Sequence, residues 1–469
     1  MEERVDLVII GGGPGGYVAA IHARQLGAQV ALVERERVGG TCLNHGCIPT
    51  KALIHSAEVL RLAREGGRYG VVGTEGARPD FPRMQERKAG VVETLVGGVE
   101  KLLQNHGVRL FQGTAALEGP HTVRVRPDGG PEVLLEAGRV ILATGSEPSP
   151  LPVPGAGLPG VLDSRDLLQI REIPSSLVVI GGGVIGMEMA LLFHFLGSRV
   201  SVVEMLPNIL PPAEPELARR FALLVRQMGL ALHTGARVLE IVSGEDGRLG
   251  VTFEGKKGPE TVWGERVLVA AGRRPSDGGL DLERLGIARS GRAIAVDERL
   301  ETSLPGVYAV GDCTGGALLA HRAFYHGEVA AENALGRNRR VDEHAIPYCI
   351  YTWPELAGVG LTLEQARAAG RPCQEARFPF SANGRALAMG ESVGQVRLVY
   401  DPEEGTVLGV HLLGPYASEL LGEATLAVQA GIRVQEMAEV VHAHPTLSEV
   451  LGEAAKAAAW GEAIHCRKM

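Results

Sequence analysis

The sequence predicts an α/β fold with two Rossmann-like dinucleotide-binding domains and a C-terminal α+β dimer-interface domain. The main reason is a repeat: residues 8–34 and 178–204 share one pattern at a constant offset of 170 residues, without a gap. A second, shorter repeat follows each copy, at residues 139–148 and 266–275. Strands that alternate with helices in this way are typical of parallel sheets covered by helices.

Composition excludes several classes of protein. The chain has 469 residues, with 45% hydrophobic and 22% charged residues, as in ordinary globular proteins of about three domains. Its net charge of −8 is the wrong sign for electrostatic binding to nucleic acid or anionic membranes. The N-terminus lacks a signal peptide, and no stretch has the length of a membrane helix. We therefore expect a soluble, cytoplasmic protein that binds neither nucleic acid nor membrane.

The long repeat has the form strand, glycine-rich turn, helix, strand, acid. Each acid falls 23 residues after the first glycine of its turn. A single G-x-G-x-x-G is a weak signal, but two complete units are a strong one. The residues that define the two units are Gly11, Gly13, Gly16 and Glu34, and Gly181, Gly183, Gly186 and Glu204.

Each residue of this pattern has a physical role in binding a dinucleotide. The first glycine permits the tight turn, the second lets the backbone approach a pyrophosphate, and the third lets the helix pack on the strand. The helix N-terminus attracts the phosphates, and the acid accepts hydrogen bonds from a ribose. A structural turn without ligand is the alternative. We expect two bound dinucleotides.

The shorter repeat ends each nucleotide-binding unit with a strand, a glycine and a turn proline. The two glycines are Gly145 and Gly272, and each lies downstream of its own G-x-G-x-x-G. The first unit is longer than the second, partly because of a predicted helix over 81–106. Apolar residues recur along that helix at helical spacing, which predicts a face toward the core or toward another subunit. These residues are Met84, Val91, Leu95, Val99 and Leu102.

Another insertion in the first unit carries two cysteines five positions apart. In a reducing compartment, Cys42 and Cys47 are expected to be redox-active or metal-binding rather than a structural crosslink. Cys47 precedes Pro49, so its sulfur would lie at a helix N-terminus, where a thiolate is stabilised, with Lys51 one turn further along. Zinc and two inert buried thiols are the alternatives, but no second cysteine pair completes a zinc site. We favour a cycling dithiol and disulfide and expect no metal.

Hydride transfer by a nicotinamide and thiol–disulfide exchange by the cysteines need a mediator. A nicotinamide transfers hydride whereas a disulfide opens by thiolate attack, and a flavin can react with both. We therefore assign FAD to the first unit, which carries the cysteines, and a nicotinamide nucleotide to the second. Glu204 is followed by no arginine that would bind a 2′-phosphate, which favours NAD over NADP.

Thiol chemistry near neutral pH also needs a proton carrier, which suits histidine. Among 14 histidines, His444 stands out because Pro445 restricts its backbone and Glu449 follows where its carboxylate could orient the ring. The alternative is a helix-capping Thr446 with a glutamate in the first turn. We do not expect His442 to be the base.

Taken together, the segments GGTCLNHGCIPTKAL, TSLPGVYAVGD and HAHPTLSE and the two fingerprints resemble the flavoprotein disulfide reductases, most closely the dihydrolipoamide dehydrogenases. The resemblance covers essentially the whole chain. It implies an FAD domain, an NAD domain, a central domain returning to FAD and a dimer-interface domain. The expected boundaries are 1–149, 150–276, 277–345 and 346–469.

The same resemblance implies roles for particular residues. It implies that Asp312 binds the ribityl chain of FAD and that Lys51 pairs with Glu188 beside the flavin. Cys47 would be the flavin-proximal thiol and Cys42 the interchange thiol. His444, oriented by Glu449, would be the base, donated by the opposite subunit of a homodimer.

The implied reaction oxidises protein-bound dihydrolipoamide with reduction of NAD. The implied partners are lipoyl domains and the E2 subunit-binding domain of 2-oxo acid dehydrogenase complexes. A glutathione-reductase-like or a mercuric-reductase-like enzyme is the alternative. The first should carry basic residues after Glu204, and the second an adjacent cysteine pair at the C-terminus where this chain has only Cys466. A role mainly in docking is a further alternative, but the presence of all the redox residues argues for catalysis.

Overall fold

The chain folds as two compact units, each assembled from segments that are distant in sequence. The computed structural model describes residues 2–127, 129–256 and 258–466. The first unit comprises Met1–Pro152, Val161–Ile173 and Leu268–Val341. The second unit comprises Val153–Gly160, Pro174–Val267 and Asp342–Met469.

A seven-stranded sheet forms the centre of the first unit, with the order β3-β2-β1-β6-β5-β4 and with β19 beside β6. Strands β3, β2, β1, β6 and β19 pair in parallel, whereas β4 and β5 are antiparallel. The carboxyl ends of the parallel strands therefore meet at one edge. The strands are β1 (Glu2–Ile10), β2 (Val30–Glu34), β3 (Arg109–Gln112), β4 (Thr114–Gly119), β5 (Thr122–Arg126), β6 (Val133–Leu142) and β19 (Val307–Ala309).

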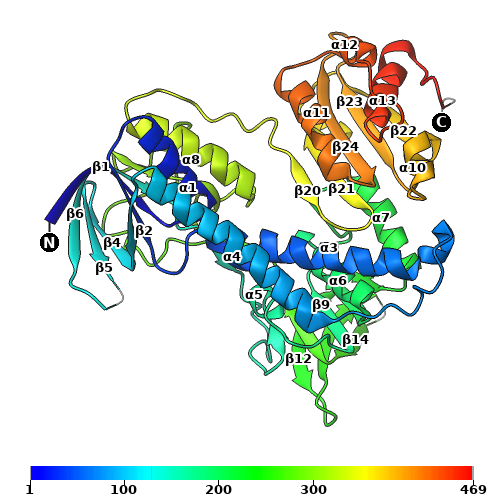
Figure 1. Cartoon of the computed structure of the whole chain (residues 1–469), viewed down its shortest axis with the longest axis horizontal. Helices are drawn as coiled ribbons and strands as arrows, with labels where there is room; N and C mark the ends of the chain where they lie inside the picture. Colours follow the sequence, from blue (N-terminus) through cyan, green and yellow to red (C-terminus); the bar gives the residue numbers. More distant parts are fainter. Residues whose placement is uncertain (1, 128, 257, 467–469) are drawn as a thin grey trace. The chain divides into compact units, whose positions relative to one another are not determined.

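Helices α1 (Pro14–Gln25) and α8 (Ala320–Ala334) run side by side over this sheet (Figure 1). Small residues permit the close approach: a Cβ at Gly327 would lie 2.4 Å from the carbonyl oxygen of Gly15. Alanines of both helices join the buried core against β1 and β2. A segment more than 300 residues further along the chain thus completes the first nucleotide-binding unit.

The predicted helix over 81–106 is present as α4 (Phe81–Asn105). Its buried face differs from the expected stripe, because Val92, Val96 and Val99 enter the core while Leu95 and Leu102 are 40% and 48% exposed. The predicted stripe therefore faces the core of this unit only in part, through Val99. A face toward another subunit stays a prediction.

The second unit begins with a parallel sheet in the order β11-β10-β9-β15, covered by α6 (Val184–Leu196) and α7 (Pro215–Gln227). An antiparallel sheet with the order β12-β13-β14 follows β11 in the chain. The strands are β9 (Ser176–Ile180), β10 (Arg199–Glu204), β11 (Ala231–Thr234), β12 (Arg237–Ser243), β13 (Leu249–Gly255), β14 (Gly258–Gly264) and β15 (Arg266–Val269).

The C-terminal part of the second unit is a five-stranded antiparallel sheet with the order β20-β21-β24-β23-β22. Helices α11 (Ala417–Gln429) and α13 (Glu449–Trp460) pack on it and close an apolar core (Figure 1). The strands are β20 (Tyr348–Ile350), β21 (Glu355–Gly360), β22 (Gln374–Pro379), β23 (Gln395–Tyr400) and β24 (Val407–Gly414).

Short elements connect these layers. The redox segment forms α2 (Gly40–His45) and α3 (Cys47–Arg64). The other helices are α5 (Ser164–Leu167), α9 (Leu363–Ala368), α10 (Gly384–Ala388), α12 (Val434–Glu439), η1 (Gly66–Tyr69), η2 (Gly311–Thr314) and η3 (Phe380–Ala382). The remaining strands are β7 (Ser146–Pro148), β8 (Val161–Leu162), β16 (Arg273–Pro275), β17 (Arg289–Ser290) and β18 (Ala293–Ile294).

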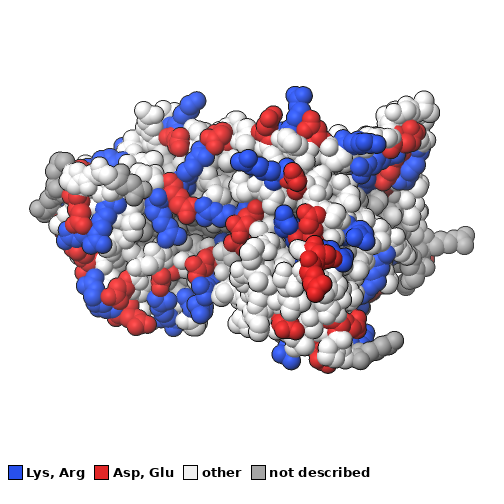
Figure 2. Space-filling model, turned by 90° about the horizontal axis from the view of Figure 1, so that it is seen from below, with Lys and Arg blue, Asp and Glu red and all other residues white. Residues whose placement is uncertain are grey.

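Two parallel sheets with fingerprint helices and a C-terminal antiparallel domain confirm the predicted fold class. Within the described ranges, no helix is both long and apolar enough to cross a membrane. Basic and acidic side chains alternate over the surface seen in Figure 2, without a large area of one sign.

Candidate active site

The two fingerprint turns have the same backbone geometry. Gly11 and Gly181 end their strands at φ of +105° and +110°, a conformation that side chains rarely adopt. Gly13 and Gly183 cap α1 and α6 with φ near −70° and ψ of −174° in both copies. The repeat in the sequence is therefore a repeat in structure, and the first glycine has the role predicted for it.

The third glycine of each turn packs the helix against the strand. A Cβ at Gly16 would lie 1.8 Å from the carbonyl oxygen of Gly11, and a Cβ at Gly186 would lie 1.9 Å from that of Gly181. Any side chain at these positions would push helix and strand apart. The position requires glycine for packing, independently of any ligand.

The second glycine faces open space. A Cβ at Gly183 would meet no atom within 4 Å, and one at Gly13 would meet only the Cα of Gly40 at 3.9 Å. Glycine is therefore not required by contacts within the chain at these positions. A ligand that approaches the backbone would explain it, and a pyrophosphate at the N-terminus of α1 or α6 fits.

The two acids are held in the same way. The Gly12 N–H donates to Oε2 of Glu34 at 2.6 Å, and the Gly182 N–H donates to Oε2 of Glu204 at 2.5 Å. The other oxygen of each acid accepts from the backbone two residues further on, at 2.7 and 2.6 Å. Each carboxylate is thus fixed between turn and strand, with lone pairs left for a ribose.

Asp312 lies in η2, directly after β19, at the same sheet edge as the first fingerprint. Its Oδ2 accepts a hydrogen bond of 2.5 Å from the hydroxyl of Ser146. Arg273 donates to that hydroxyl oxygen at 2.9 Å and to the Ser146 carbonyl at 2.6 Å. Burial lowers the pKa of Arg273, and the charges of Asp312 and Asp163 oppose this shift, so the guanidinium stays charged.

Sequence reasoning missed Ser146 and Arg273. They directly follow Gly145 and Gly272, the glycines of the shorter repeat, and the two repeat copies pair with each other through β7 and β16. The Ser276 N–H donates to the Gly145 carbonyl, and the Ser149 N–H to that of Gly272, both at 3.0 Å. The repeated glycine turn marks these positions in the sequence. Neither copy of the repeat, however, indicates that the two copies pair with each other.

The cysteines lie on both sides of a helix break. Cys42 is in α2, whereas Cys47 is the first residue of α3, and Gly46 separates the two helices. They form no disulfide in this structure, and their side chains are in hydrogen-bond contact. The break at Gly46 therefore brings the two sulfurs together, as a cycling dithiol and disulfide requires.

The electrostatic surroundings of the two sulfurs differ. The hydrogen bond to Cys47, followed by burial and by repulsion from a Cys47 thiolate, raises the pKa of the Cys42 thiol. The positive charge of Lys51 opposes this shift only in part. Cys42 therefore keeps its proton, while Cys47 is at the helix N-terminus that favours a thiolate.

Lys51 and Glu188 belong to different compact units, so their pairing beside a flavin stays a prediction. Glu188 is buried, with 4% of its surface exposed, in α6. Its Oε1 accepts a hydrogen bond of 3.0 Å from the backbone N–H of Tyr351. The carboxylate is thus oriented by the loop after β20.

His444 and Glu449 contact each other in the second unit. Nδ1 of His444 lies 2.8 Å from Oε1 of Glu449, and the ring is 77% exposed. Burial acts to raise the pKa of Glu449, but hydrogen bonds from His444 and the Thr446 N–H hold it below its ordinary value. An ionised carboxylate that holds Nδ1–H leaves Nε2 free to accept a proton.

The alternative in which Thr446 caps the following helix is present only in part, because Oε2 of Glu449 accepts from the Thr446 N–H at 2.8 Å but the Thr446 hydroxyl does not cap the helix. The helix begins at Glu449 with Ser448 at its N-cap, and the Thr446 hydroxyl donates to the Ala443 carbonyl at 2.7 Å. His442 is different from His444, because its ring is buried and Nε2 lies 2.9 Å from Oε1 of Glu423. The hydrogen bond that Glu423 accepts raises the pKa of His442, in a pair that is separate from His444 and Glu449.

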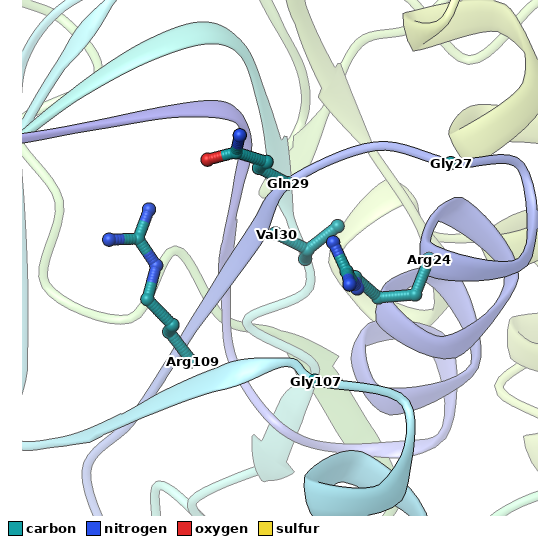
Figure 3. Close-up of a pocket in the computed structure, with 6 residues that line it drawn as sticks. All are labelled: Arg24, Gly27, Gln29, Val30, Gly107 and Arg109. Atoms are coloured by element: carbon teal, nitrogen blue, oxygen red, sulfur yellow. The ribbon is translucent and has the colours of Figure 1, made fainter.

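A pocket of about 560 Å³ lies elsewhere in the first unit, where β2 and β3 begin (Figure 3). This edge is opposite to the fingerprint edge. Arg24 donates to the carbonyls of His106 and Ala28 at 2.7 and 2.6 Å. Arg109 pairs with Glu3 at 2.7 Å. Both cations have structural partners, and the pocket is separate from the candidate active site.

No group of three or more His, Cys, Asp or Glu side chains within the described ranges is arranged to hold a metal ion. The grouped chemistry of the chain is instead a dithiol, two nucleotide turns and a histidine–carboxylate pair. This set is what a comparison with known proteins has to explain.

The family description "Pyridine nucleotide-disulphide oxidoreductase" matches residues 5–327, and the dimerisation domain of that family matches residues 346–455. A dihydrolipoyl dehydrogenase from Thermus scotoductus is 44% identical over 469 residues, with 98% of each chain covered. A dihydrolipoyl dehydrogenase from Bacillus subtilis is 41% identical over 476 residues, covering 99% of this chain and 100% of the relative.

Solved structures agree. LpdA from Mycobacterium tuberculosis superposes with a TM-score of 0.89 at 29% identity, covering 97% of this chain and 99% of that one. The HOCl-induced flavoprotein disulfide reductase RclA from Escherichia coli gives a TM-score of 0.85 at 30% identity, with 96% and 99% covered. The chain therefore belongs to the pyridine nucleotide-disulphide oxidoreductase family, including its dimerisation domain.

Proposed function

We propose that this chain is a dihydrolipoyl dehydrogenase that oxidises protein-bound dihydrolipoamide and reduces NAD⁺ to NADH. Family membership implies sites for FAD and for a nicotinamide nucleotide, and the two fingerprints fit them. The observation that carries the proposal is the dithiol Cys42 and Cys47, placed at the fingerprint edge of the first unit. Full-length relatives with this activity in their names, at 41–44% identity, support it.

In this proposal the domains are FAD-binding (1–149), NAD-binding (150–276), central (277–345) and dimer-interface (346–469). The residues proposed to hold FAD are Gly11, Gly13, Gly16, Glu34, Gly145 and Asp312. The residues proposed to hold NAD are Gly181, Gly183, Gly186, Glu204 and Gly272. The open Cβ positions at Gly13 and Gly183 support a pyrophosphate at each turn.

The thiol steps follow from the chemistry of the pair. A substrate thiolate attacks the Cys42 sulfur of the Cys42–Cys47 disulfide, a mixed disulfide forms, and Cys47 leaves as a thiolate. The second substrate thiolate attacks the substrate sulfur of the mixed disulfide, which closes the lipoamide ring and releases Cys42. The substrate loses two electrons, and the cysteine pair gains them.

Two protons leave the substrate in these steps. His444 accepts one at Nε2, with its ring held by Glu449. Cys42 takes up the other, in agreement with its raised pKa, while Cys47 stays a thiolate. Lys51, one helical turn after Cys47, supplies a positive charge near the pair. When bound, the flavin supplies two-electron transfer between this dithiol and the nicotinamide.

NAD preference follows from the second acid. Glu204 accepts a ribose hydroxyl but repels a 2′-phosphate, and the next residues, Met205 and Leu206, carry no charge. The dimerisation domain supports a homodimer, in which His444 would reach the disulfide of the other subunit. Lipoyl domains and the E2 subunit-binding domain of 2-oxo acid dehydrogenase complexes are the proposed partners, and the cytoplasm is the proposed location.

Turnover of purified protein tests this function. We expect a yellow protein with one FAD per chain. With dihydrolipoamide as the electron donor, it should reduce NAD⁺ much faster than it reduces NADP⁺. Glutathione disulfide and Hg²⁺ with NADH or NADPH serve as competing substrates. Faster turnover of either one, or a colourless protein that does not take up FAD, would contradict the proposal. Cys466 argues against mercury, because it is single and packs against the C-terminal core.

A further inference from the structure

His45 lies between the two redox cysteines, and the reaction above gives it no role. It is the last residue of α2, directly before the break at Gly46. Its Nε2 lies 3.5 Å from Oε2 of Glu36. Its Nδ1 is buried and has no hydrogen-bond partner among the residues that the structure describes. A buried polar atom without a partner costs free energy, so this placement calls for a compensating role.

The partner of His45 is itself fixed. Glu36 lies in the loop after β2, two residues beyond the FAD acid, and its N–H donates to Oε1 of Glu34 at 2.7 Å. Its carboxylate also accepts a hydrogen bond of 3.1 Å from Arg165 of α5, and its carbonyl accepts one of 2.5 Å from Gln112. Glu36 is thus a fixed point on the sheet, close to the nucleotide site.

The charges around the ring keep it neutral. Protonation would place a second N–H, at Nδ1, in a buried position without an acceptor. Burial lowers the pKa of His45, the cation Arg165 lowers it further, and the more distant Arg37 adds to this, while Glu36 opposes them. Burial raises the pKa of Glu36, but the hydrogen bond and charge of Arg165 outweigh it, so this carboxylate is ionised. A neutral imidazole therefore directs Nε2–H toward a carboxylate.

We propose that His45 is a positioning residue for the redox turn, the segment 40–47. By contacting Glu36 it holds α2 to the loop that follows β2, and so keeps Cys42 within bonding reach of Cys47. The turn contains two glycines, Gly40 and Gly46, and the contact of His45 adds to the hydrogen bond of 3.1 Å from Asn44 to the Val38 carbonyl in holding one conformation. This inference rests on the proposed thiol–disulfide function, and His45 itself touches no reacting atom.

The test is the closure of the cysteine disulfide in the holoenzyme. The protein is equilibrated with known ratios of oxidised and reduced dithiothreitol, quenched with an alkylating agent and analysed by mass spectrometry. Oxidised dithiothreitol takes up the two electrons and two protons that the thiols release. The equilibrium constant measures the effective concentration of one thiol beside the other.

Two variants of similar side-chain size separate the tether from packing. His45→Met fills the space without a hydrogen-bond donor, and should lower the constant for disulfide closure by about 3- to 10-fold. His45→Gln restores a donor toward Glu36 and should return the constant to near the wild-type value. Arg165→Gln frees Glu36 from its other partner and should shift the constant in the same direction as His45→Met, but less.

His55→Gln is the matched control. His55 also pairs with a glutamate, at 3.1 Å from Glu58, but its side chain lies on α3 and is 62% exposed. Its substitution should leave the constant unchanged. Equal constants for wild type, His45→Met and His45→Gln would overturn the proposal, and so would an equal fall in both variants, which would indicate packing alone. Wild-type protein without dihydrolipoamide turnover would instead contradict the proposed function.

Discussion

At the scale of single residues, the twin acids Glu34 and Glu204 each do two things. Both oxygens of each carboxylate accept backbone N–H groups at 2.5–2.7 Å, so the acid orders the turn before any ribose is bound. The same residue then accepts from the ribose. Hydrogen bonds to charged groups are among the stronger ones, which explains why both units use an ionised side chain here.

This duplication predicts a reciprocal pair of phenotypes. Glu204→Gln should weaken NADH binding by about 10- to 150-fold, since a hydrogen bond to a charged group is worth about 1.5–3 kcal/mol, and should leave FAD content unchanged. Glu34→Gln should lower FAD retention and spare NADH binding. Flavin absorbance of the purified variants and titration with NADH give the two readouts. Loss of both nucleotides in both variants would contradict independent sites.

His444 carries the second residue-scale prediction. His444→Gln should lower turnover of dihydrolipoamide by about 10²- to 10⁴-fold, the usual contribution of general acid–base catalysis. Glu449→Gln should lower turnover less, because the glutamine carbonyl can still accept the hydrogen bond from the His444 ring, although the ionised partner is lost. Reduction of the enzyme by NADH does not use this base and should persist in both variants, measured by stopped-flow absorbance.

Much of this site could be predicted from single residues, and the failures have physical reasons. The first and third glycines of each fingerprint have the turn and packing roles expected of them, because these roles depend on local backbone geometry. The role of the second glycine at a pyrophosphate stays a prediction. The contacts of Arg273 with Ser146 could not be predicted, since they join two turns 127 residues apart. The burial of His45 Nδ1 without a hydrogen-bond partner could not be predicted from the sequence either, because burial of one ring atom is set by tertiary packing.

At the scale of elements, the strand–turn–helix units separate glycines that serve folding from glycines that serve binding. Gly186→Ala places a methyl 1.9 Å from the Gly181 carbonyl oxygen, and should lower the free energy of unfolding by about 1–3 kcal/mol, as overpacking does. Gly183→Ala places it in open space. It should leave the thermal midpoint unchanged and weaken NADH binding. Thermal unfolding and NADH titration check both, and equal thermal midpoints would contradict this distinction.

Strand β24 contains a buried histidine that makes stability depend on pH. Burial lowers the pKa of His411 from 6.5 to about 4, while its Nε2 lies 3.1 Å from the Leu361 carbonyl. Below pH 6.5 the unfolded chain binds a proton that the folded chain refuses. The contribution to stability is therefore complete above pH 6.5, and about 3 kcal/mol of it is lost as the pH falls to about 4.

His411→Gln removes this titration but keeps a donor for Leu361. Chemical unfolding at pH 7.0, 5.5 and 4.5, with protein and FAD concentrations fixed, should show a steeper loss of unfolding free energy in the wild type than in the variant. Parallel pH profiles would show that His411 is not the source of the dependence.

The sequence pattern located α4 but not its buried face. The large apolar residues of this helix share one broad face, and the predicted stripe of Met84, Val91, Leu95, Val99 and Leu102 follows one edge of that face, whereas the core contacts the edge with Val92 and Val96. Periodicity identifies an apolar face but not which edge of a broad face is buried. The helix break at Gly46 was easier to predict from the sequence, because the glycine and the helix start at Cys47-x-Pro49 are local signals.

At the scale of the whole molecule, the proposed active site needs two chains. If His444 acts on the disulfide of its partner, then mixing Cys42→Ser chains with His444→Gln chains should restore turnover. One site of each heterodimer would combine an intact Cys42 with an intact His444. We expect about half the wild-type activity per isolated heterodimer, measured after purification with two different affinity tags.

The controls for this experiment are the two homodimers, which should both be nearly inactive. A heterodimer as inactive as they are would show that each chain carries a complete site. Repeats show that a unit is duplicated, but they do not show that segment 268–341 returns to the first unit, because that depends on packing between distant helices. The return was expected only from the family resemblance, as a central domain over 277–345.

That return sets an order of events during synthesis on the ribosome. The inner edge of β6, which ends at Leu142, is completed by β19, which begins at Val307. At about 5–20 residues per second, the nascent chain waits roughly 10–30 s between the two. During that time the end of β6 that pairs with β19, Val140 to Leu142, lacks this neighbour, and Asp312 has not yet been made. The first nucleotide-binding unit is therefore complete only after about two thirds of the chain has been synthesised.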